Sequence, residues 1–578
     1  MERKSDVILL AIERIPQWVF LSILFLFQLI FIPQGLDFAD EGFFMTFYQQ
    51  IFNDPESVTY AFMYWFAGVL GGSLYALFPE DGLLLMRFAG VLIIVLTAAF
   101  VCRILKPYLP LWTIRVGVAM SVLYIFDDVP SLYYNNVSAL LYVGGIGLLL
   151  KGIRAENSKG WIIGAGMIFA LNAFTRIPNV LGVVFVLIIL YEAWIFRKGI
   201  KWAVCTAAYF LTGYFSALLL VFLCMWRVGH LHPFFTCLDW IFHIGQSSEA
   251  SHNIYSMFRT TVRQYLEIGF TGLFFAFWGI CFFYLIRRFR NKTFIRIVAI
   301  FAFLVLASFL YFYGALYLLY FLSLATVLFL LWKEPSSIKT VALAAGMLLV
   351  IQPLGSDGAV DLVGRFSMFL TLPLVVAYSE KEVRELSVSR GISNRILRKT
   401  GSILLILFVC LSVQRHVSYT YFDQGSRFKK IYSVDHLFLR GIYTSQKRAS
   451  VSQEVLSALD RYVSEGDYTL IYDNSPMLHY LTQTKPYAYN PWLYLYDKDL
   501  LQEALSRAGR ERQALPVVVL QKFKGLWIDW PDGYSDDYMA NDANKGKNLL
   551  INRFLYKNKY LKIWTNGYYE IWLPEYEK

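Results

Sequence analysis

From its N-terminus to about residue 414, the chain consists of long apolar runs separated by short polar turns. A membrane-spanning helix needs ~20 mostly apolar residues, and thirteen runs have this character, several of them only with flanking residues. They lie at 15–36, 82–105, 112–127, 136–150, 161–176, 178–196, 202–226, 264–286, 297–313, 314–332, 338–354, 364–379 and 401–414. Because no small-residue cleavage site follows the first run, we expect it to remain as a permanent span.

The amino-acid composition points the same way. Hydrophobic residues make up 57% of the 578 residues, charged residues 16%, and the mean hydropathy is +0.48. Soluble chains have ~25% charged residues, so this composition excludes a soluble enzyme, a fibrous protein and a disordered one. The fold class predicted is a polytopic α-helical membrane protein of about 13 spans.

The positive charges are sorted by side of the membrane. If the apolar run at 60–78 does not cross, the N-terminus and six turns share one side and carry 25 Lys and Arg, whereas the opposite loops carry five. Since Lys and Arg concentrate in cytoplasmic loops, we expect a cytoplasmic N-terminus and a re-entrant or surface-lying helix at 60–78. The net charge of +11 therefore reflects topology, and we expect no nucleic-acid partner.

After residue 414 the chain changes character, and residues 415–578 contain no spanning run. VSQEVLSALDRYVSEG has Val451, Val455, Leu456, Leu459 and Val463 on one side, which predicts an amphipathic helix. YTLIYD and PVVVLQKF are typical of strands, and LKIWTNGYYEIWL predicts a hairpin around Asn566-Gly567. The chain is thus expected to have a transmembrane module at 1–414 and a soluble extracytoplasmic α/β domain at 415–578.

The distribution of cysteines and the lack of glycosylation sequons in the outer domain indicate the cellular compartment. The six cysteines include no CxxC pair and no metal-ligand spacing. The outer domain lacks both cysteine and an N-x-S/T sequon. These observations favour a bacterial inner membrane, with the C-terminal domain in the periplasm, over the endoplasmic reticulum.

The first outer loop, 37–81, contains no Lys or Arg but begins with Asp37, Asp40 and Glu41. Phe44, Phe47, Tyr48, Ile51 and Phe52 follow at helical spacing, which predicts an amphipathic helix in the membrane interface. Carboxylates are costly near hydrocarbon, so their clustering suggests a general base or a cation site. The alternative is that Asp40 only caps the helix, with Glu41 favourable in its first turn; for Asp37 the two readings are balanced.

The acidic pair Asp40-Glu41 after the first span, the juxtamembrane helix, the dozen or so spans and the outer C-terminal domain together resemble the GT-C superfamily of polytopic glycosyltransferases. The arrangement is similar to that of the lipid A aminoarabinose transferases and the protein O-mannosyltransferases. This resemblance implies that Asp40 is the catalytic base with Glu41 as its neighbour. It also implies a donor sugar carried on a polyprenyl phosphate.

Other outer loops supply candidate binding residues. Relatives place an acidic residue in the second outer loop; here Asp127 and Asp128 come slightly early, and Asn135 and Asn136 stand closer to that position. These polar residues are equally explained as the ends of short helices. Arg176 in TRIPN, and likewise Arg365 after GSDGAVDLVG, either pairs with the donor phosphate or extends to lipid headgroups.

The long outer loop 227–263 carries four of the seven histidines. His230-x-His232 lacks further ligands at metal spacing, so a metal site is not favoured there. The resemblance implies instead a mobile loop over the acceptor site, and we expect Tyr255, Arg259 and Arg263 in it to contact a phosphate or the acceptor.

Together these features predict an inverting glycosyltransferase on the outer membrane face. Its partners would be a polyprenyl-phosphate-linked sugar donor, a lipid, glycan or protein acceptor, and the bilayer; no cofactor is expected, and a divalent metal is not favoured. Two alternatives stay open: a ligase or polymerase that moves a lipid-linked oligosaccharide, and a polytopic transporter, although neither mid-span polar groups nor internal repeats are evident.

Overall fold

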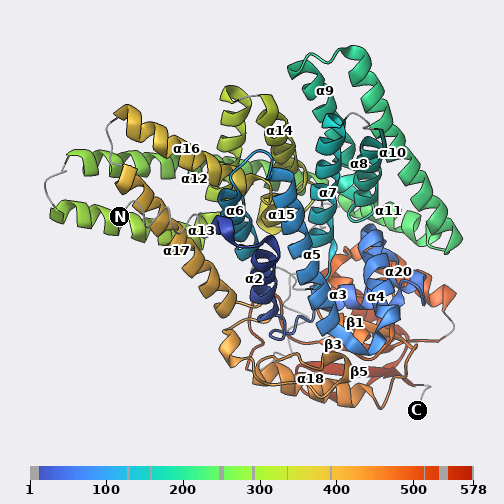
Figure 1. The fold of residues 1–578 in the computed structure, drawn as a ribbon. Helices are drawn as coiled ribbons and strands as arrows, with labels where there is room; N and C mark the ends of the chain where they lie inside the picture. The colour runs from blue at the N-terminus through green and yellow to red at the C-terminus, as the bar shows by residue number, and fades with distance from the viewer. Residues whose placement is uncertain are drawn as a thin grey trace.

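The computed structural model describes residues 12–125, 131–155, 159–246, 253–288, 293–334, 336–390, 394–512, 514–532 and 545–575. Helices dominate residues 12–418, and a small sheet lies in the C-terminal part (Figure 1). Because a bilayer offers no hydrogen-bond partners, apolar runs close their backbone hydrogen bonds internally as helices. The apolar periodicity of the sequence is therefore expressed as helices almost throughout.

A bundle of upright helices forms the centre of the molecule (Figure 1). Its members are α2 (Gln17–Leu29), α5 (Gly82–Leu105), α6 (Leu111–Leu123), α7 (Tyr134–Arg154), α8 (Lys159–Ala173), η3 (Ile177–Phe185), α9 (Val186–Ile195) and α10 (Ile200–Arg227). The short helix α11 (Leu231–Gln246) follows α10. Sequence analysis predicted a mobile loop over 227–263, and this is wrong for α11, whose Trp240 is buried among C-terminal tyrosines.

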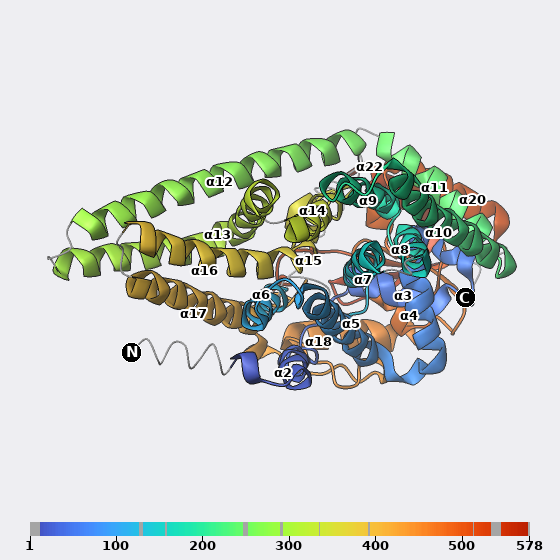
Figure 2. The same ribbon diagram turned by 45° about the horizontal axis from the view of Figure 1, so that its top comes forward.

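A second group of helices projects from one side of this bundle (Figure 2). It comprises α12 (Ile254–Arg288), α13 (Thr293–Lys333), α16 (Thr371–Arg390) and α17 (Asn394–Ser418), with α14 (Ser336–Ile351) and α15 (Ala359–Ser367) between them and the bundle. The runs 297–313 and 314–332, predicted as separate spans, are joined in α13 and separated only by non-helical backbone at Gly314.

By length and hydropathy, the described residues contain eight helices able to cross a membrane, or nine if α15 and the bent start of α16 form one broken span. Gln17–Leu29, Leu111–Leu123 and Ser337–Ile351 are apolar but shorter. The chain is thus a multi-pass membrane protein, and the count of thirteen stays a prediction.

The C-terminal part is an α/β domain, as predicted. Its five strands are β1 (Tyr468–Tyr472), β2 (Lys485–Pro486), β3 (Val517–Gln521), β4 (Tyr560–Thr565) and β5 (Tyr569–Pro574), in the order β2-β1-β3-β5-β4. β1 is parallel to β2 and β3, whereas β5 is antiparallel to β3 and β4. The helices α18 (Gln446–Leu459), α19 (Met477–Leu481), α20 (Lys498–Glu511) and α22 (Lys545–Lys557) accompany the sheet. The predicted helix, the two predicted strands and the hairpin are confirmed.

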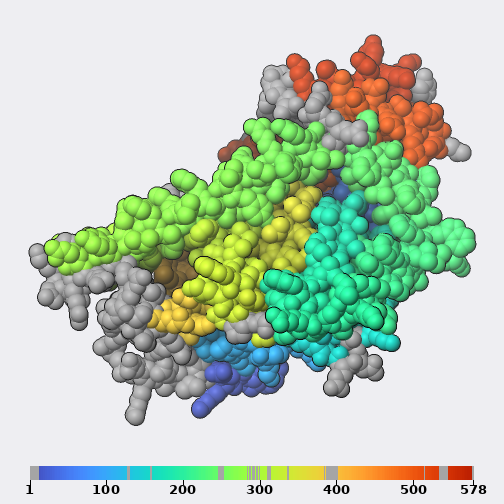
Figure 3. Space-filling view, turned by 90° about the horizontal axis from the view of Figure 1, so that it is seen from above, coloured from blue at the N-terminus to red at the C-terminus, as the bar shows by residue number. Residues whose placement is uncertain are grey.

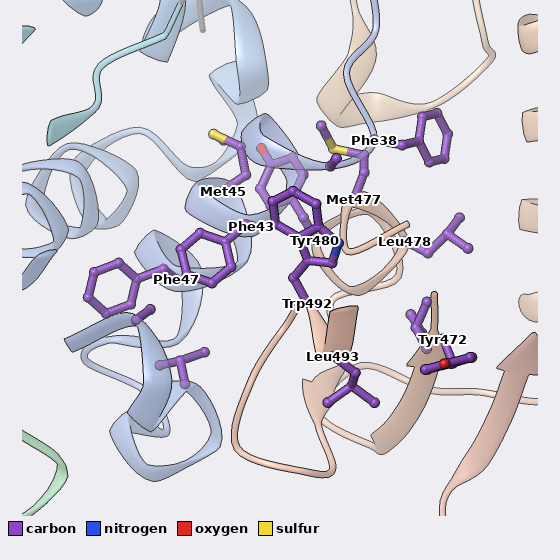
Figure 4. Close-up of a cluster of buried hydrophobic side chains, with 14 of the residues drawn as sticks. Phe38, Phe43, Met45, Phe47, Tyr472, Met477, Leu478, Tyr480, Trp492 and Leu493 are labelled. Carbon is purple, nitrogen blue, oxygen red and sulfur yellow. The ribbon is translucent and has the colours of Figure 1, made fainter. Parts of the chain in front are cut away.

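The first outer loop is built into this domain. It contains α3 (Asp40–Gln50), η1 (Pro55–Tyr64) and α4 (Trp65–Leu77), and one continuous apolar core joins these elements to the sheet and its helices (Figure 4). In that core Phe38, Phe43 and Met45 lie close to Met477 and Tyr480 of α19. The membrane-side and outer domains therefore form one folded unit at this end.

Gly42 permits the closest part of this contact. A Cβ atom there would lie 2.2 Å from the backbone nitrogen of Met477, so only glycine allows α3 to pack directly on α19. Residues 41–50 of α3 are all buried. The helix predicted here is confirmed, but the C-terminal domain covers the face opposite the bundle, so α3 is buried on all sides. Its position in the membrane interface stays a prediction.

The segment 60–78 touches the C-terminal domain at both ends. Near its start, the backbone N–H of Tyr60 donates to the carbonyl of Tyr489 at 3.1 Å, and near its end the ring of Tyr75 lies 6.3 Å from that of Tyr480. A segment with both ends on one side of the membrane does not cross it. These contacts support the prediction of a non-crossing helix, although the segment is long and apolar enough to span.

Topology can be tested with reporter fusions. Fusions after Leu150, Lys333 and Lys399 should report cytoplasm, and a fusion near Gly425 should report the outer side, because the 25-to-5 division of Lys and Arg orients the chain. Alkaline phosphatase and a fluorescent protein that matures only in the cytoplasm provide opposite readouts at each position. A cytoplasmic signal at Gly425 would contradict the assignment.

Candidate active site

The N-terminus of α3 is capped by Asp37. Its two carboxylate oxygens accept hydrogen bonds from the backbone N–H groups of Ala39 and Glu41, each at 2.8 Å. The first N–H groups of a helix have no partner within the helix, and Asp37 supplies partners for them. The capping role considered for Asp40 in the sequence thus belongs to Asp37, whereas Asp40 accepts a hydrogen bond from Tyr421.

Glu41 is held in a buried ion pair. The Arg87 guanidinium donates Nε–H to Oε1 at 2.7 Å and Nη2–H to Oε2 at 2.6 Å, with the residues 1% and 0% exposed. Ser131 Oγ also donates to Glu41. Arg87 further donates to the carbonyls of Ile32 at 2.6 Å and Gly35 at 2.7 Å. One arginine therefore joins α3, α5 and the chain leaving the first helix.

The C-terminal domain fixes the loop just before Asp37. The backbone N–H of Leu36 donates to Asp423 Oδ2 at 2.9 Å, and Arg448 Nη1 donates to the Leu36 carbonyl at 2.6 Å. Lys430 pairs with the same Asp423 at 2.9 Å. Burial acts to raise the pKa of Asp423, but the charges of Arg448 and Lys430 outweigh it and hold that pKa below its usual value.

Asp40 lies beside this clamp and is only partly buried. Its Oδ2 accepts a hydrogen bond from the phenol of Tyr421 at 2.6 Å. Burial raises the pKa of Asp40 to about 6, the Tyr421 hydrogen bond opposes the rise, and the negative charge of Asp357 adds to it. A carboxylate with a pKa close to the working pH is suited to accept and release a proton.

The loop between α14 and α15 brings Asp357 toward this site. Arg176 holds the loop by donating Nη1–H to the Gln352 carbonyl and Nη2–H to the Leu354 carbonyl, each at 2.7 Å. Gly355 has φ +73°, and a Cβ there would lie 2.3 Å from the Pro178 ring. A positive φ with so close an approach requires glycine, so the TRIPN segment and this loop fit closely together.

Tyr64 lies between the acidic and basic parts of the site. Its ring stacks on Tyr134 with centroids 4.3 Å apart. Burial raises the pKa of Tyr64 well above its usual value, and both Arg176 and Asp40 are close enough to influence it. The structure thus gathers Asp40, Tyr421, Asp357, Arg176 and Tyr64 at the boundary between the bundle and the C-terminal domain.

Arg263 and Arg365 belong to a neighbouring cluster. Both interact electrostatically with Asp361, which accepts hydrogen bonds from Gln264 at 2.9 Å and Tyr317 at 3.2 Å. Asp361 follows the loop that carries Asp357, so this loop connects the two clusters. Tyr255 and Arg259 are exposed on α12, and no described contact joins them to Asp40.

The described part of the second outer loop stabilises the start of α7. Asn136 accepts the backbone N–H of Tyr133 at 3.1 Å and donates to the Ser131 carbonyl at 2.9 Å, which completes a capping box at the start of α7. Asp127 and Asp128 lie outside the described residues.

His230 is buried in an aromatic environment. Trp65 Nε1 donates to its Nδ1 at 3.1 Å, and its ring stacks on Phe52. His232 lies 3.6 Å from Glu56. Across the described ranges no group of three or more His, Cys, Asp and Glu side chains has the geometry to hold a metal ion.

Arg87, Tyr421 and Asp357 did not emerge from the sequence. The position of Arg87 inside the apolar run 82–105 was an indication in the sequence, since a charge there needs a partner. Nothing in the sequence indicated Tyr421 or Asp357, because they lie more than 300 residues from Asp40 and only the folded chain brings them together.

This architecture, a helical bundle whose first outer loop is joined to a C-terminal α/β domain, is similar to that of a solved polytopic membrane protein. The crystal structure of ArnT from Cupriavidus metallidurans bound to undecaprenyl phosphate is similar over 96% of this chain and 97% of its own, with 10% identity and a TM-score of 0.50. The apo form of that protein covers the same shares at 11% identity with a TM-score of 0.44. No protein-family model and no curated protein sequence matches the chain.

A second protein of known structure matches less of its own length. The oligosaccharyltransferase from Archaeoglobus fulgidus, in complex with Zn and sulfate, matches 87% of this chain and 68% of its own at 9% identity, with a TM-score of 0.43. The likeness to ArnT, at a TM-score of 0.50, establishes a common fold.

The Glu41–Arg87 pair makes a stability prediction. Arg87→Met should destabilise the folded protein by ~3–5 kcal/mol, because it leaves a buried carboxylate without its counter-charge. Adding Glu41→Gln should recover part of that loss. Thermal unfolding of the single and double variants in detergent measures the coupling between the two residues. Additive effects would show that the pair is not energetically coupled.

Proposed function

We propose that this protein is an inverting glycosyltransferase that moves a sugar from a polyprenyl-phosphate carrier to an acceptor hydroxyl on the outer membrane face. The observation that carries the proposal is the environment of Asp40. Because Asp37 caps the helix, the Asp40 carboxylate is left to accept a hydrogen bond from Tyr421, and burial raises its pKa to about 6. Support also comes from the fold shared with ArnT, which was solved with undecaprenyl phosphate.

Asp40 is the general base of the proposed reaction. The acceptor oxygen attacks the anomeric carbon as Asp40 takes the hydroxyl proton, and the bond from that carbon to the phosphate oxygen breaks. The polyprenyl phosphate leaves with the electron pair, and the configuration at the carbon inverts. Because the leaving phosphate is already ionised, the reaction needs no strong acid.

Arg176 is the proposed partner of the donor phosphate. Guanidinium groups bind phosphate through paired N–H donors, and two of the five N–H donors of Arg176 are used by the carbonyls of Gln352 and Leu354. We assign Tyr255, Arg259 and Arg263 to contact with a phosphate or the acceptor, and Arg365, like Arg176, to the donor phosphate. Asp37 and Glu41 then act as positioning residues, since their carboxylate oxygens are engaged within the fold.

The donor reaches this site from the membrane in the proposed arrangement. Seen from the end of the bundle opposite the C-terminal domain, the molecule has a hollow bordered by α12 on one side and by yellow and teal helices on the other (Figure 3). Blue atoms from the N-terminal part of the chain are visible at the bottom of the hollow. An apolar carrier chain is best accommodated between spanning helices of this kind.

The pH profile tests the role of Asp40. Transfer should require the ionised carboxylate, so log kcat/KM should fall as pH drops below about 6. Tyr421→Phe removes the hydrogen bond that lowers this pKa, so the acidic limb should move to higher pH. Tyr432→Phe, which alters an exposed tyrosine of the same segment, should leave the limb unchanged. Asp40→Asn should reduce transfer ~10²-fold or more above about pH 6, where the carboxylate is ionised, and should remove the acidic limb.

The stability of Asp40→Asn distinguishes a catalytic role of Asp40 from a structural one. The pKa of Asp40 is higher in the folded protein than its ordinary value of 3.8. The stability contributed by Asp40 is therefore fully present below pH 4 and lost as pH rises through about 6. Asp40→Asn should accordingly leave the protein as stable or more stable at pH 7.5. A large loss of stability there, with transfer preserved, would return Asp40 to a structural role.

The donor class can be tested with purified protein in detergent. A polyprenyl-phosphate monosaccharide should support transfer and a nucleotide sugar alone should not, because the proposed site lies on the side opposite nucleotide-sugar synthesis. Activity should survive EDTA. Turnover with the nucleotide sugar would overturn the donor assignment, and transfer only from a diphosphate-linked oligosaccharide would favour a ligase. Loss of activity in EDTA would contradict the metal-independent mechanism.

A further inference from the structure

A large cavity lies at the end of the bundle farthest from Asp40. The N-terminal ends of α5 and α7 contact the outer part of the chain, since Gly82 approaches the Phe438 backbone and Tyr134 stacks on Tyr64. Their C-terminal ends therefore point away from the C-terminal domain (Figure 1). The cavity is lined by the C-terminal halves of α5 and α7 and by part of α8.

The cavity has the size and lining of a lipid site. Its volume is about 820 Å³, within the ~300–1,000 Å³ that is typical of small-molecule sites. Apart from three cations, the residues of its wall are apolar or aromatic, including Phe100, Leu140 and Leu148. Gly144 borders free space, since a Cβ atom added there would meet nothing within 4 Å.

Three cations lie at one end of this apolar cavity. Arg103 at the end of α5, and Lys151 and Arg154 at the end of α7, all line it. Lys151 Nζ lies 3.4 Å from the centroid of the Trp161 ring, and the Arg154 guanidinium lies 4.4 Å from that of Tyr108. No acidic side chain occurs among the described residues of the lining. Outside the lining, Glu192 interacts electrostatically with Arg154, and Arg154 Nη2 donates to the Ser337 carbonyl at 3.2 Å.

Helix dipoles explain only part of this arrangement. Cations are favourable at helix C-termini, and this accounts for basic residues in the last turns of α5 and α7. It does not account for their convergence on one apolar cavity. Basic pockets between spanning helices are typical binding sites for anionic lipid headgroups, and an apolar cavity beneath such a pocket matches an acyl chain.

The depth of the cavity fits one leaflet. Its lining on α7 runs from Leu140 to Arg154, which at 1.5 Å per residue is ~21 Å. One leaflet contributes about half of the ~30 Å hydrocarbon core, and the remainder reaches the headgroup region. The cations therefore stand at the height of a headgroup while the leucines stand at the height of its acyl chain.

We infer that this cavity binds one anionic glycerophospholipid from the leaflet opposite the Asp40 site. Its phosphate-bearing headgroup pairs with Arg103, Lys151 and Arg154, and an acyl chain lies against α5, α7 and α8. This site is separate from the proposed donor site and does not depend on the proposed reaction.

Native mass spectrometry of the delipidated full chain in detergent tests the inference. Phosphatidylglycerol, phosphatidylcholine and undecaprenyl phosphate are each titrated, and apparent Kd values are compared. Phosphatidylglycerol should bind at least about tenfold more tightly than phosphatidylcholine. Arg103→Gln with Lys151→Gln should weaken phosphatidylglycerol about 25-fold, because each cation near an anionic headgroup contributes about fivefold. Lys106→Gln, a neighbouring cation outside the cavity, should change nothing.

Gly144→Phe tests the cavity without removing charge. Because a Cβ atom there would meet nothing within 4 Å, the side chain should extend into the cavity and abolish one equivalent of bound phospholipid. Unchanged melting temperatures show that the variants fold; if the double variant does not, Gly144→Phe decides alone. Equal affinities for phosphatidylglycerol and phosphatidylcholine, full binding by Gly144→Phe, or tighter binding of undecaprenyl phosphate at this site would overturn the inference.

Discussion

The buried ion pair between Glu41 and Arg87 is the contact on which the geometry of the site depends. Arg87 uses its guanidinium to hold Glu41 at the start of α3 and the carbonyls of Ile32 and Gly35 at the end of the first helix. A charge removed from water needs such complete pairing. The pair therefore fixes where the chain leaves the bundle, and with it the position of Asp37 and Asp40.

Three neighbouring carboxylates acquire three different roles from their surroundings. Asp37 binds two backbone N–H groups, Glu41 binds a guanidinium, and Asp40 has the single phenol of Tyr421 together with repulsion from Asp357. Proteins commonly give neighbouring carboxylates different pKa values, and so different roles, by placing them in different environments. Burial raises the pKa of both Asp37 and Asp40, but Asp37 is engaged by two backbone N–H groups, whereas Asp40 is only partly buried and bound by one phenol.

Local patterns in the sequence predict the bundle, the C-terminal α/β domain and its Asn566-Gly567 hairpin, because hydrophobic periodicity and turn residues act over short distances. The burial of α3 escaped prediction, since the second covering surface comes from α19, more than 400 residues away. For the same reason the acidic cluster was recognisable, but its division into a cap, an ion pair and the carboxylate that we propose as the base was not. That division depends on Arg87, Tyr421 and Asp357, which the fold alone brings to it.

The central claim is that Asp40 is the base of a transfer from a polyprenyl-phosphate sugar. The most direct measurement is a cryo-electron microscopy structure of the full chain with a non-transferable polyprenyl-phosphate sugar analogue bound. The account predicts that the anomeric carbon lies on the Asp40 side of the bundle, with room for one acceptor hydroxyl between them, and that the phosphate contacts Arg176. A sugar phosphate bound out of reach of Asp40, or at the opposite end of the spans, would contradict it.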